Sequence, residues 1–254
     1  MAKIVALVNQ KGGVAKTTTA VNLAACLAKD GKKVLLADLD PQGNATSGLG
    51  FERSEIKRCV YDVLINGASA EEVTLATPYA RLSLIPATIQ LAGAEIELVS
   101  ALSRETKLKR ALNPLAKAYD YIFLDCPPSL GLLTVNALAA ADSLIIPIQS
   151  EYYALEGLSQ LMNTFDLVKK HLNPDLRIEG VLLTMFDPRT NLAVQVAEEV
   201  RGYFGANVYE AVISRNVRLS ESPSHGKPIF YYDARSKGAE QYQQLAGEFL
   251  SRQK

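Results

Sequence analysis

Residues near the N-terminus constrain the fold more than any other part of the chain. Residues 8–19, Val-Asn-Gln-Lys-Gly-Gly-Val-Ala-Lys-Thr-Thr-Thr, follow the apolar run 4–7 and precede the helical sequence 20–24. A strand, a loop of small residues ending in Lys-Thr and then a helix form a phosphate-binding loop, because backbone N–H groups and the helix N-terminus face the anion. Lys16 adds a charge and Thr17 a hydroxyl for Mg²⁺. The sequence therefore predicts that the chain binds ATP or GTP.

This loop departs from the general P-loop pattern, since Gln10 and Ala15 stand where that pattern has glycine. It matches instead the deviant form with an extra lysine, Lys11-Gly12-Gly13-x-x-Lys16-Thr17. Lys11 is additional to a standard phosphate cradle, so we interpret it as reaching a phosphate from outside, as an arginine finger does in trans. Ala15 lies where the loop enters the helix, and we expect a negative φ there that does not require glycine.

Composition limits the classes of partner and compartment. The 254 residues include 27 basic and 27 acidic ones, so any contact with nucleic acid must come from a local patch. Cys26, Cys59 and Cys126 lie far apart without a C-x-x-C pair, which favours reduced thiols over disulfides or a zinc site. The first apolar run is too short for a signal peptide, and no later run approaches a membrane span. We expect a soluble, cytoplasmic protein.

Short apolar runs that suit buried parallel strands recur along the chain, at residues 4–7, 34–37, 82–85, 121–124, 144–148 and 181–185. Helical periodicity separates several of them, for example over residues 155–168. This alternation predicts an α/β fold with a doubly wound, mostly parallel sheet, helices on both faces and ligands at the carboxyl ends of the strands. We expect a single P-loop ATPase domain over residues 1–254. Residues 51–80 show weak periodicity and are interpreted as short helices and loops.

Two of the predicted strands end in carboxylates. Asp38 and Asp40 follow the run 34–37, and Asp125 follows the run 121–124 in the form of a Walker B strand, which directs a carboxylate toward Mg²⁺. Asp40 is a candidate to position the attacking water or to assist Mg²⁺ through a water, and Asp38 to hold the loop or a magnesium water. The alternative is that both aspartates only cap the turn and the following helix.

The segment after Asp125, Cys-Pro-Pro-Ser at 126–129, predicts a stiff, extended stretch where a switch that senses the γ-phosphate would lie. Farther along, residues 213–237 hold five basic residues against Glu221 and Asp233, a local charge of +3. Such a patch suffices for salt-sensitive, sequence-independent contacts with DNA phosphates, although the chain contains no recognisable base-reading module. On charge alone, a solvated charged face is the simpler interpretation.

Several motifs in order resemble those of chromosomal ParA (Soj-type) partitioning ATPases, a deviant P-loop family related to MinD. Besides Lys11, they are Asp-Leu-Asp-Pro-Gln-Gly-Asn at 38–44, Asp-Cys-Pro-Pro-Ser at 125–129, Glu-Tyr-Tyr-Ala-Leu-Glu-Gly at 151–157 and Arg-Asn-Val-Arg-Leu-Ser-Glu at 215–221. The resemblance runs from residue 3 to about residue 245. It implies an ATP-sandwich homodimer in which Lys11 touches the partner's nucleotide. It also implies nucleoid association, because the ATP-bound dimer coats DNA without sequence preference, and a ParB-type protein that stimulates slow ATP hydrolysis.

The resemblance also implies roles for individual residues. The implied catalytic residues are Lys11, Lys16 and Asp40. The implied nucleotide-binding residues are Lys11, Gly12, Gly13, Val14, Ala15, Lys16, Thr17, Thr18, Ser214, Arg215 and Asn216. The implied magnesium-binding residues are Thr17, Asp40 and Asp125. The implied DNA-binding residues are Arg189, Arg215, Arg218, Lys227, Arg235 and Lys237. Ala15 and Ser214 depart from the family, which commonly has glycine at the first position and Ile-Pro-Arg-Asn around the second.

Two alternatives share the nucleotide site. A MinD-like, membrane-associated ATPase needs a basic amphipathic helix at its C-terminus. Here the last helical stretch carries a stripe typical of a core, Ala239, Tyr242, Leu245, Ala246 and Phe249. A metabolic P-loop enzyme or iron–sulfur reductase needs a substrate pocket or cluster cysteines, and Cys126 directly follows Asp125. We therefore expect DNA rather than a membrane as the surface that this chain binds.

Overall fold

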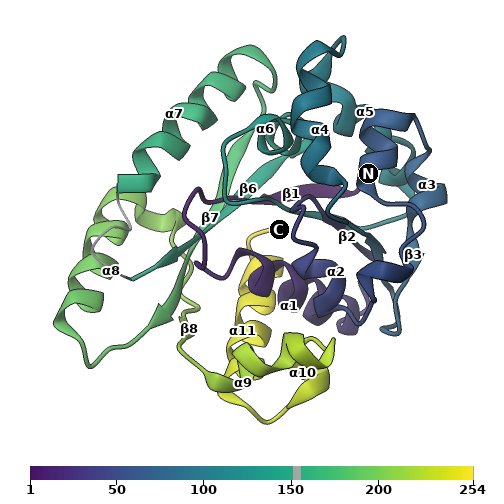
Figure 1. Cartoon of the computed structure of the whole chain (residues 1–254). Coiled ribbons are helices and arrows are strands. Elements are labelled where there is room, and N and C mark those ends of the chain that lie inside the picture. Colours follow the sequence, from purple (N-terminus) through teal and green to yellow (C-terminus); the bar gives the residue numbers. More distant parts are fainter. Residues whose placement is uncertain (151–155, 254) are drawn as a thin grey trace.

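The computed structural model describes residues 1–150 and 156–253, which are built around one eight-stranded sheet (Figure 1). The strand order is β3-β4-β2-β5-β1-β6-β7-β8, and only β3 runs antiparallel to its neighbour. The strands are β1 (Lys3–Leu7), β2 (Val34–Asp38), β3 (Leu75–Ala76), β4 (Leu82–Ile85), β5 (Tyr121–Asp125), β6 (Ser143–Gln149), β7 (Arg177–Phe186) and β8 (Ile213–Ser214). The predicted doubly wound, mostly parallel α/β fold is confirmed.

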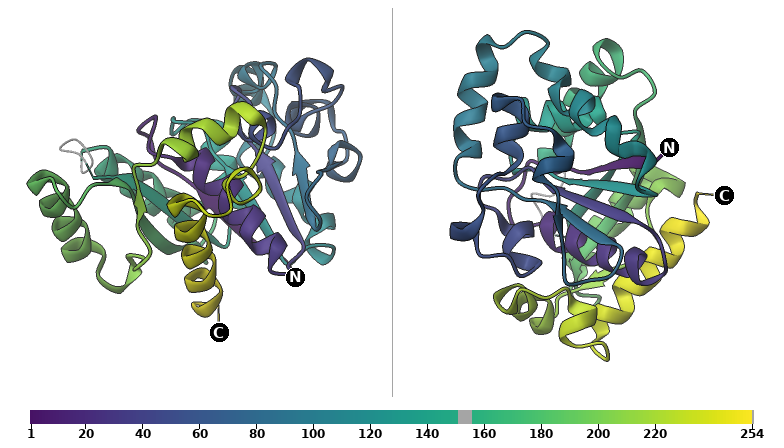
Figure 2. Two further views of the ribbon diagram at one scale, coloured as in Figure 1. Left: turned by 90° about the horizontal axis from the view of Figure 1, so that it is seen from below. Right: turned by 90° about the vertical axis from the view of Figure 1, so that its right-hand side faces the viewer.

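Helices cover both faces of this sheet, as the views along its edges show (Figure 2). They are α1 (Lys16–Lys29), α2 (Asn44–Gly48), α3 (Ala70–Val73), α4 (Leu91–Glu97), α5 (Lys107–Leu112), α6 (Leu132–Ala140), α7 (Glu156–His171), α8 (Asn191–Phe204), α9 (Val217–Glu221), α10 (Ile229–Tyr232) and α11 (Lys237–Ser251). Among the described residues, none of these helices is long and apolar enough to cross a membrane. All three cysteines are buried and unbridged.

Two hydrophobic cores sandwich the sheet, because neighbouring residues of a strand point to opposite faces. In β1, Val5 and Leu7 belong to the core beneath α1 and α11, whereas Ala6 joins the core beneath α4 to α8. The stripe at 239–249 is fully buried in α11, so its interpretation as core is confirmed. At the end of α11, Glu248 accepts hydrogen bonds from the backbone N–H groups of Glu210 and Ala211, at 2.9 Å each.

All six predicted apolar runs are strands, with ends that differ by at most a few residues. Two strands that the sequence did not predict, β3 and β8, lie at the two edges of the sheet and have two residues each. Residues 51–80 form short helical turns and loops as expected, apart from β3. The periodic stretch at 155–168 falls in α7, with Leu155 outside the described residues.

Candidate nucleotide-binding site

The predicted phosphate-binding loop lies between the end of β1 at Leu7 and the start of α1 at Lys16. Polar side chains fix the loop to the neighbouring strands. The hydroxyl of Thr184 on β7 donates to the carbonyl of Val14 at 3.1 Å. The side chain of Asn9 donates to the carbonyl of Pro147 on β6 at 2.8 Å and accepts from the N–H of Lys11 at 2.9 Å. The loop is therefore a shaped element rather than a free turn.

Lys16 occupies the centre of this loop and is only 6% exposed. Its ammonium donates to the backbone carbonyl of Lys11 at 3.0 Å, so the loop curls around the charge. Burial lowers the pKa of Lys16, and the negative charges of Asp125 and Asp40 oppose that change. A positive charge held in a loop of backbone N–H groups suits an anionic ligand such as a polyphosphate.

The expectation of a negative φ at Ala15 is wrong. Ala15 has φ 65° and ψ 31°, in the left-handed region, and Gly13 has φ 75°. The backbone turns into α1 through a left-handed residue, and this conformation is needed at position 15 even though the residue there is alanine. A non-glycine residue pays about 1–2 kcal/mol for this conformation. Such strain persists where the surroundings determine the backbone, and here the bond from Thr184 to Val14 does so.

Replacing Ala15 by glycine is expected to stabilise the protein by about 0.5–1 kcal/mol, since the relief of left-handed strain exceeds the entropy that glycine adds to the unfolded chain. Urea unfolding measures this difference. Ala28→Gly, in the ordinary helical backbone of α1, is the matched control and should destabilise by about 1 kcal/mol or more. Equal losses of stability in the two variants would contradict the assignment of strain to Ala15.

The two strand-end aspartates Asp38 and Asp125 are directly paired in register on β2 and β5, and both are fully buried. Asp38 accepts hydrogen bonds from the N–H of Asp40 at 3.1 Å and from the N–H and hydroxyl of Thr46 at 2.8 Å each. Burial raises the pKa of Asp38 to about 6, against the effect of the Thr46 bonds. Asp38 therefore holds the loop after β2, which was one of its predicted roles.

Asp125 differs from Asp38 because neither of its buried carboxylate oxygens has a hydrogen-bond partner of ordinary geometry among the described residues. Burial and the charge of Asp38 raise its pKa well above the usual range, while the nearby Thr17 hydroxyl and Lys16 act in the opposite direction. A buried carboxylate without partners costs free energy unless a ligand satisfies it. Its position beside a threonine hydroxyl suits a hard divalent cation such as Mg²⁺.

Asp40 completes this group. It is 7% exposed, and one of its oxygens accepts from the N–H of Gln42 at 2.9 Å, so it also caps its own turn. Its charge raises the pKa values of Asp38 and Asp125 and opposes the lowering at Lys16. The structure thus brings Lys16, Thr17, Asp40 and Asp125 together. In the described part of the chain, no three His, Cys, Asp or Glu residues form an all-protein metal site.

A cavity of about 390 Å³ adjoins the phosphate-binding loop. Its lining contains five predicted nucleotide-binding residues, which come from two distant parts of the sequence, together with others that sequence reasoning missed. The predicted ones are Ala15, Thr18, Ser214, Arg215 and Asn216, and those missed include Met185, Leu219 and Tyr242. The hydroxyl of Tyr242 lies 3.2 Å from that of Thr19 on α1. This contact could not be predicted from the sequence, where Tyr242 is one member of the apolar stripe of α11.

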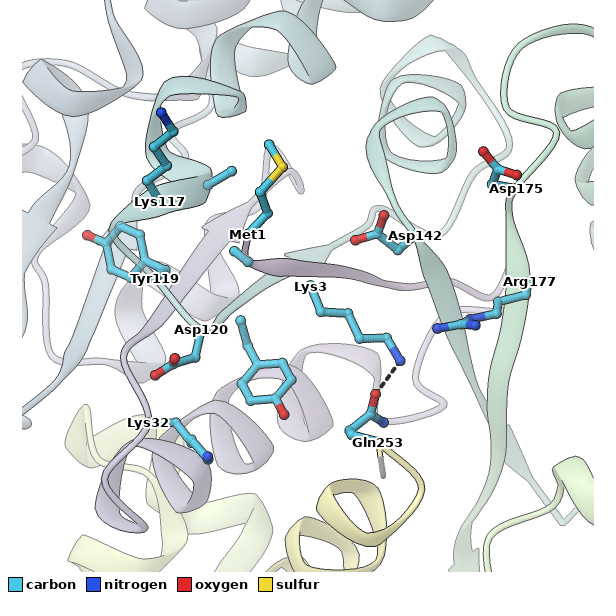
Figure 3. Close-up of a pocket in the computed structure, with 13 residues that line it drawn as sticks. Met1, Lys3, Lys32, Lys117, Tyr119, Asp120, Asp142, Asp175, Arg177 and Gln253 are labelled. Carbon is cyan, nitrogen blue, oxygen red and sulfur yellow. Dashed lines mark hydrogen bonds between the residues drawn. The ribbon is translucent and has the colours of Figure 1, made fainter.

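A larger, open cavity of about 940 Å³ lies at the opposite edge of the sheet, where the strands begin (Figure 3). Lys3, Asp142 and Arg177 line it, and Lys3 donates to Gln253 near the end of the chain. Its charges are mixed, and neither the phosphate-binding loop nor the carboxylates at the ends of β2 and β5 reach it. The convergent groups therefore select the smaller cavity as the ligand site.

The predicted switch segment runs from Cys126 to the start of α6 and bends at Pro128 and Ser129, so it is not extended over its whole length as predicted. It lies against the phosphate-binding loop, since a methyl group on Gly12 would stand 3.9 Å from the β-carbon of Pro128. Glu95 on α4 accepts from the N–H of Leu133 at 3.3 Å and fixes the far end of the segment. The motif at 151–157 falls largely outside the described residues, at positions 151–155.

The predicted DNA-binding residues lie on the segments around β8, α9, α10 and the start of α11, and on the loop after β7. Arg189 pairs with Asp187 at 2.7 Å, and this contact holds the pKa of Asp187 at about 2, with a smaller effect from Arg215. Arg218 pairs with Glu221 at 3.0 Å and with Asp233 at 3.6 Å. The remaining three, Lys227, Arg235 and Lys237, are exposed. Acidic neighbours thus bind two of the arginines. Glu221 and Asp233, which the sequence counted only as charge, pair with Arg218. Asp187, which that count did not include, pairs with Arg189.

Comparison with known proteins identifies the family. Residues 2–178 match a family profile described as an AAA domain. The chain is 66% identical over 248 residues to the sporulation initiation inhibitor protein Soj of Bacillus subtilis, covering 98% of both chains. It is 59% identical over 250 residues to the chromosome partitioning protein ParA of Myxococcus xanthus, covering 98% of this chain and 88% of the relative.

Among solved structures, the fold matches a Mycobacterium smegmatis protein described as cobyrinic acid a,c-diamide synthase with bound ADP and magnesium. The TM-score is 0.88 and the identity 38%, covering 100% of this chain and 96% of the other. The sequence identities to Soj and ParA are considerably higher and extend over nearly the whole chain. The motifs that suggested partitioning ATPases and these comparisons therefore agree. This chain belongs to the Soj/ParA family of chromosome-partitioning ATPases.

Proposed function

We propose that this chain, as one domain over residues 1–254, is the ATPase of a DNA-partitioning system. The observation that carries the proposal is the buried carboxylate of Asp125, which accepts no hydrogen bond of ordinary geometry from the described residues and lies beside Lys16 and Thr17. The loop that holds these two residues also carries the additional Lys11. The relatives named for chromosome partitioning support the biological role. The solved structure with ADP and magnesium supports the ligands, ATP and Mg²⁺.

In this proposal, the loop from Lys11 to Thr18 binds the phosphates through its N–H groups and through the charge of Lys16. Thr17 and Asp125 hold Mg²⁺, with Asp40 acting directly or through a water; the ion neutralises charge that develops on the phosphates. Asp40 also orients the attacking water. Lys11 reaches the nucleotide of the partner subunit, so a homodimer forms only with ATP. The cavity beside Ser214, Arg215 and Asn216 takes the base.

DNA is the proposed partner surface, with a ParB-type protein as the stimulator of hydrolysis and the nucleoid as the place of action. The support is geometric: Lys227, within the basic segment 213–237, lines a cavity of about 240 Å³ together with Thr17 and Thr18 of the nucleotide loop. Two such segments in a dimer would double the positive charge available to a polyanion. This arrangement couples DNA binding to the bound nucleotide through dimerisation.

Asp40→Ala tests the proposed water-positioning role. We expect this variant to bind ATP with Mg²⁺ and to dimerise, but to hydrolyse ATP at least about a hundredfold more slowly, because the attacking water loses its orienting carboxylate while Thr17 and Asp125 still hold Mg²⁺. Phosphate release under single-turnover conditions and size-exclusion chromatography with ATP measure the two properties. Asp30→Ala, at the exposed end of α1, is the control. A monomer at saturating ATP, or unchanged turnover, would remove Asp40 from this role.

One assay separates the proposed function from its alternatives. The protein is incubated with ATP, with ADP or without nucleotide, and its retention is measured on plasmid DNA and on anionic liposomes. A partitioning ATPase binds DNA only with ATP. Retention on liposomes would favour a MinD-like function, and retention on neither surface would favour a metabolic enzyme such as the diamide synthase named among the similar structures.

A further inference from the structure

The short edge strand β8 forms one wall of the cavity proposed for the base. It pairs with β7 at only two positions, with an irregular register between them. Its last residue, Ser214, makes two contacts outside the sheet: its N–H donates to Oε1 of Gln241 at 3.1 Å, and its hydroxyl donates to the same oxygen at 3.0 Å. A strand with so little pairing depends on such contacts for its position.

Gln241 lies on a well-anchored part of α11. The preceding Ser236 caps the helix by accepting from the N–H of Ala239 at 3.2 Å, and the next residue, Tyr242, is fully buried against the Thr19 hydroxyl of α1. Gln241 itself is half-buried and does not line the cavity. Its hydrogen-bond partner Ser214 and the next residue, Tyr242, do line it. The side chain of Gln241 therefore links the cavity wall at Ser214 to α11, which is itself packed against α1.

Ser214 offers an N–H and a hydroxyl, and both point to the one acceptor on Gln241. A proline at this position would lack both donors and would instead restrict the backbone through its ring, which fixes φ near −65°.

We propose that Gln241 is a positioning residue for the base end of the nucleotide site, and that it acts through its two hydrogen bonds to Ser214. The proposal rests on the proposed function, in which this cavity takes the base of ATP. Gln241 acts through Ser214 and makes no contact with the nucleotide. Gln241 thereby affects the affinity for the nucleoside part of ATP. It does not affect the rate of the reaction at the phosphates.

Gln241→Leu removes the acceptor and keeps the size of the side chain. We expect the dissociation constant for ATP, measured by isothermal titration calorimetry, to rise about five- to tenfold, because two donors near the cavity lose their partner. The turnover number at saturating ATP should change less than twofold. Gln241→Glu keeps an acceptor oxygen and should retain wild-type affinity. Ser214→Pro/Gln241→Leu should return to within about twofold of wild type, because the ring then restrains the strand.

Gln244→Leu is the matched control, since Gln244 lies on the same helix and its side chain, within the described part of the chain, donates one hydrogen bond, to Glu240 at 3.4 Å. Ser214→Ala removes one donor without changing α11 and should weaken ATP binding about two- to threefold, which keeps the test independent of helix stability. Wild-type affinity in both Gln241→Leu and Ser214→Ala would overturn the proposal, as would a double variant no better than Gln241→Leu. Failure of the wild-type protein itself to bind ATP would instead refute the proposed function.

Discussion

The Lys16→Ala protein is expected to show no measurable ATP binding. Lys16 is buried inside the loop and supplies the one positive charge that lies at its centre, where its ammonium already holds the Lys11 carbonyl. Removing it leaves the buried carboxylates Asp125 and Asp40 facing the phosphates without compensation. Loss of one partner from a buried charged group costs about 3–5 kcal/mol, which corresponds to a hundredfold or greater loss of affinity. Calorimetric titration with ATP and Mg²⁺ measures it.

Lys11→Ala is the control that separates loss of ATP binding from loss of dimerisation. If Lys11 contacts the partner's nucleotide, this variant should bind ATP within a few-fold of wild type yet remain a monomer at saturating ATP, as light scattering would show. Lys11→Ala should also keep the thermal stability of the unliganded protein within a few degrees, because Lys11 is not part of the buried charge cluster of Lys16, Asp40 and Asp125. Similar losses of ATP affinity in the two variants would contradict the division of roles between the lysines.

The second large effect concerns DNA. Arg218→Glu should abolish ATP-dependent retention on plasmid DNA while ATP binding and dimerisation persist, because the change removes two units of charge per subunit from a patch of only +3. For wild type, affinity should fall at least about tenfold over a fourfold rise in salt and should scarcely depend on DNA sequence. Mobility-shift assays at two salt concentrations, with ATP, ADP or no nucleotide, measure these properties.

The ion pairs of Arg218 suggest a second variant, which should strengthen DNA binding rather than weaken it. Arg218 is paired with Glu221 and Asp233, so a phosphate must compete with these carboxylates for it. Glu221→Gln releases part of that competition and should strengthen DNA binding a few-fold at the same salt concentration. Arg189→Glu, on the loop after β7, should weaken binding less than Arg218→Glu. DNA binding without nucleotide, or an Arg218→Glu dimer that holds DNA like wild type, would contradict the assignment.

The sequence predicted correctly those elements whose residue pattern directly reflects their burial in the folded protein. The central strands are mostly apolar because both of their faces are buried, and the loop before Lys16 joins one of them, β1, to the largely buried helix α1. Asp125 lies at the end of such a strand, as its sequence pattern indicates, and its role toward Mg²⁺ stays a prediction. Strands of two residues, such as β3 and β8, are too short for any periodicity to indicate them.

Features that depend on distant parts of the chain could not be predicted. The left-handed backbone of Ala15 reflects the path of the loop toward α1 and its bond to Thr184, and nothing in the residue itself indicates it. Met185, Leu219 and Tyr242 meet in one cavity only because β7, α9 and α11 fold together. The pairing of Arg218 with Asp233 likewise depends on how α9 packs beside α10.

The order of the strands has a consequence for synthesis of the protein. β1 leaves the ribosome first, yet its two neighbours in the sheet are β5 and β6, which end at Asp125 and Gln149. Pairing over such sequence distances is slow, since a long loop must close before any contact stabilises it. The phosphate-binding loop therefore lacks its neighbouring strands until β6 has been made, and the cavity beside it is completed only by Tyr242 of α11. A nascent chain that has not yet made α11 is therefore expected not to bind nucleotide, although the whole phosphate-binding loop has already left the ribosome.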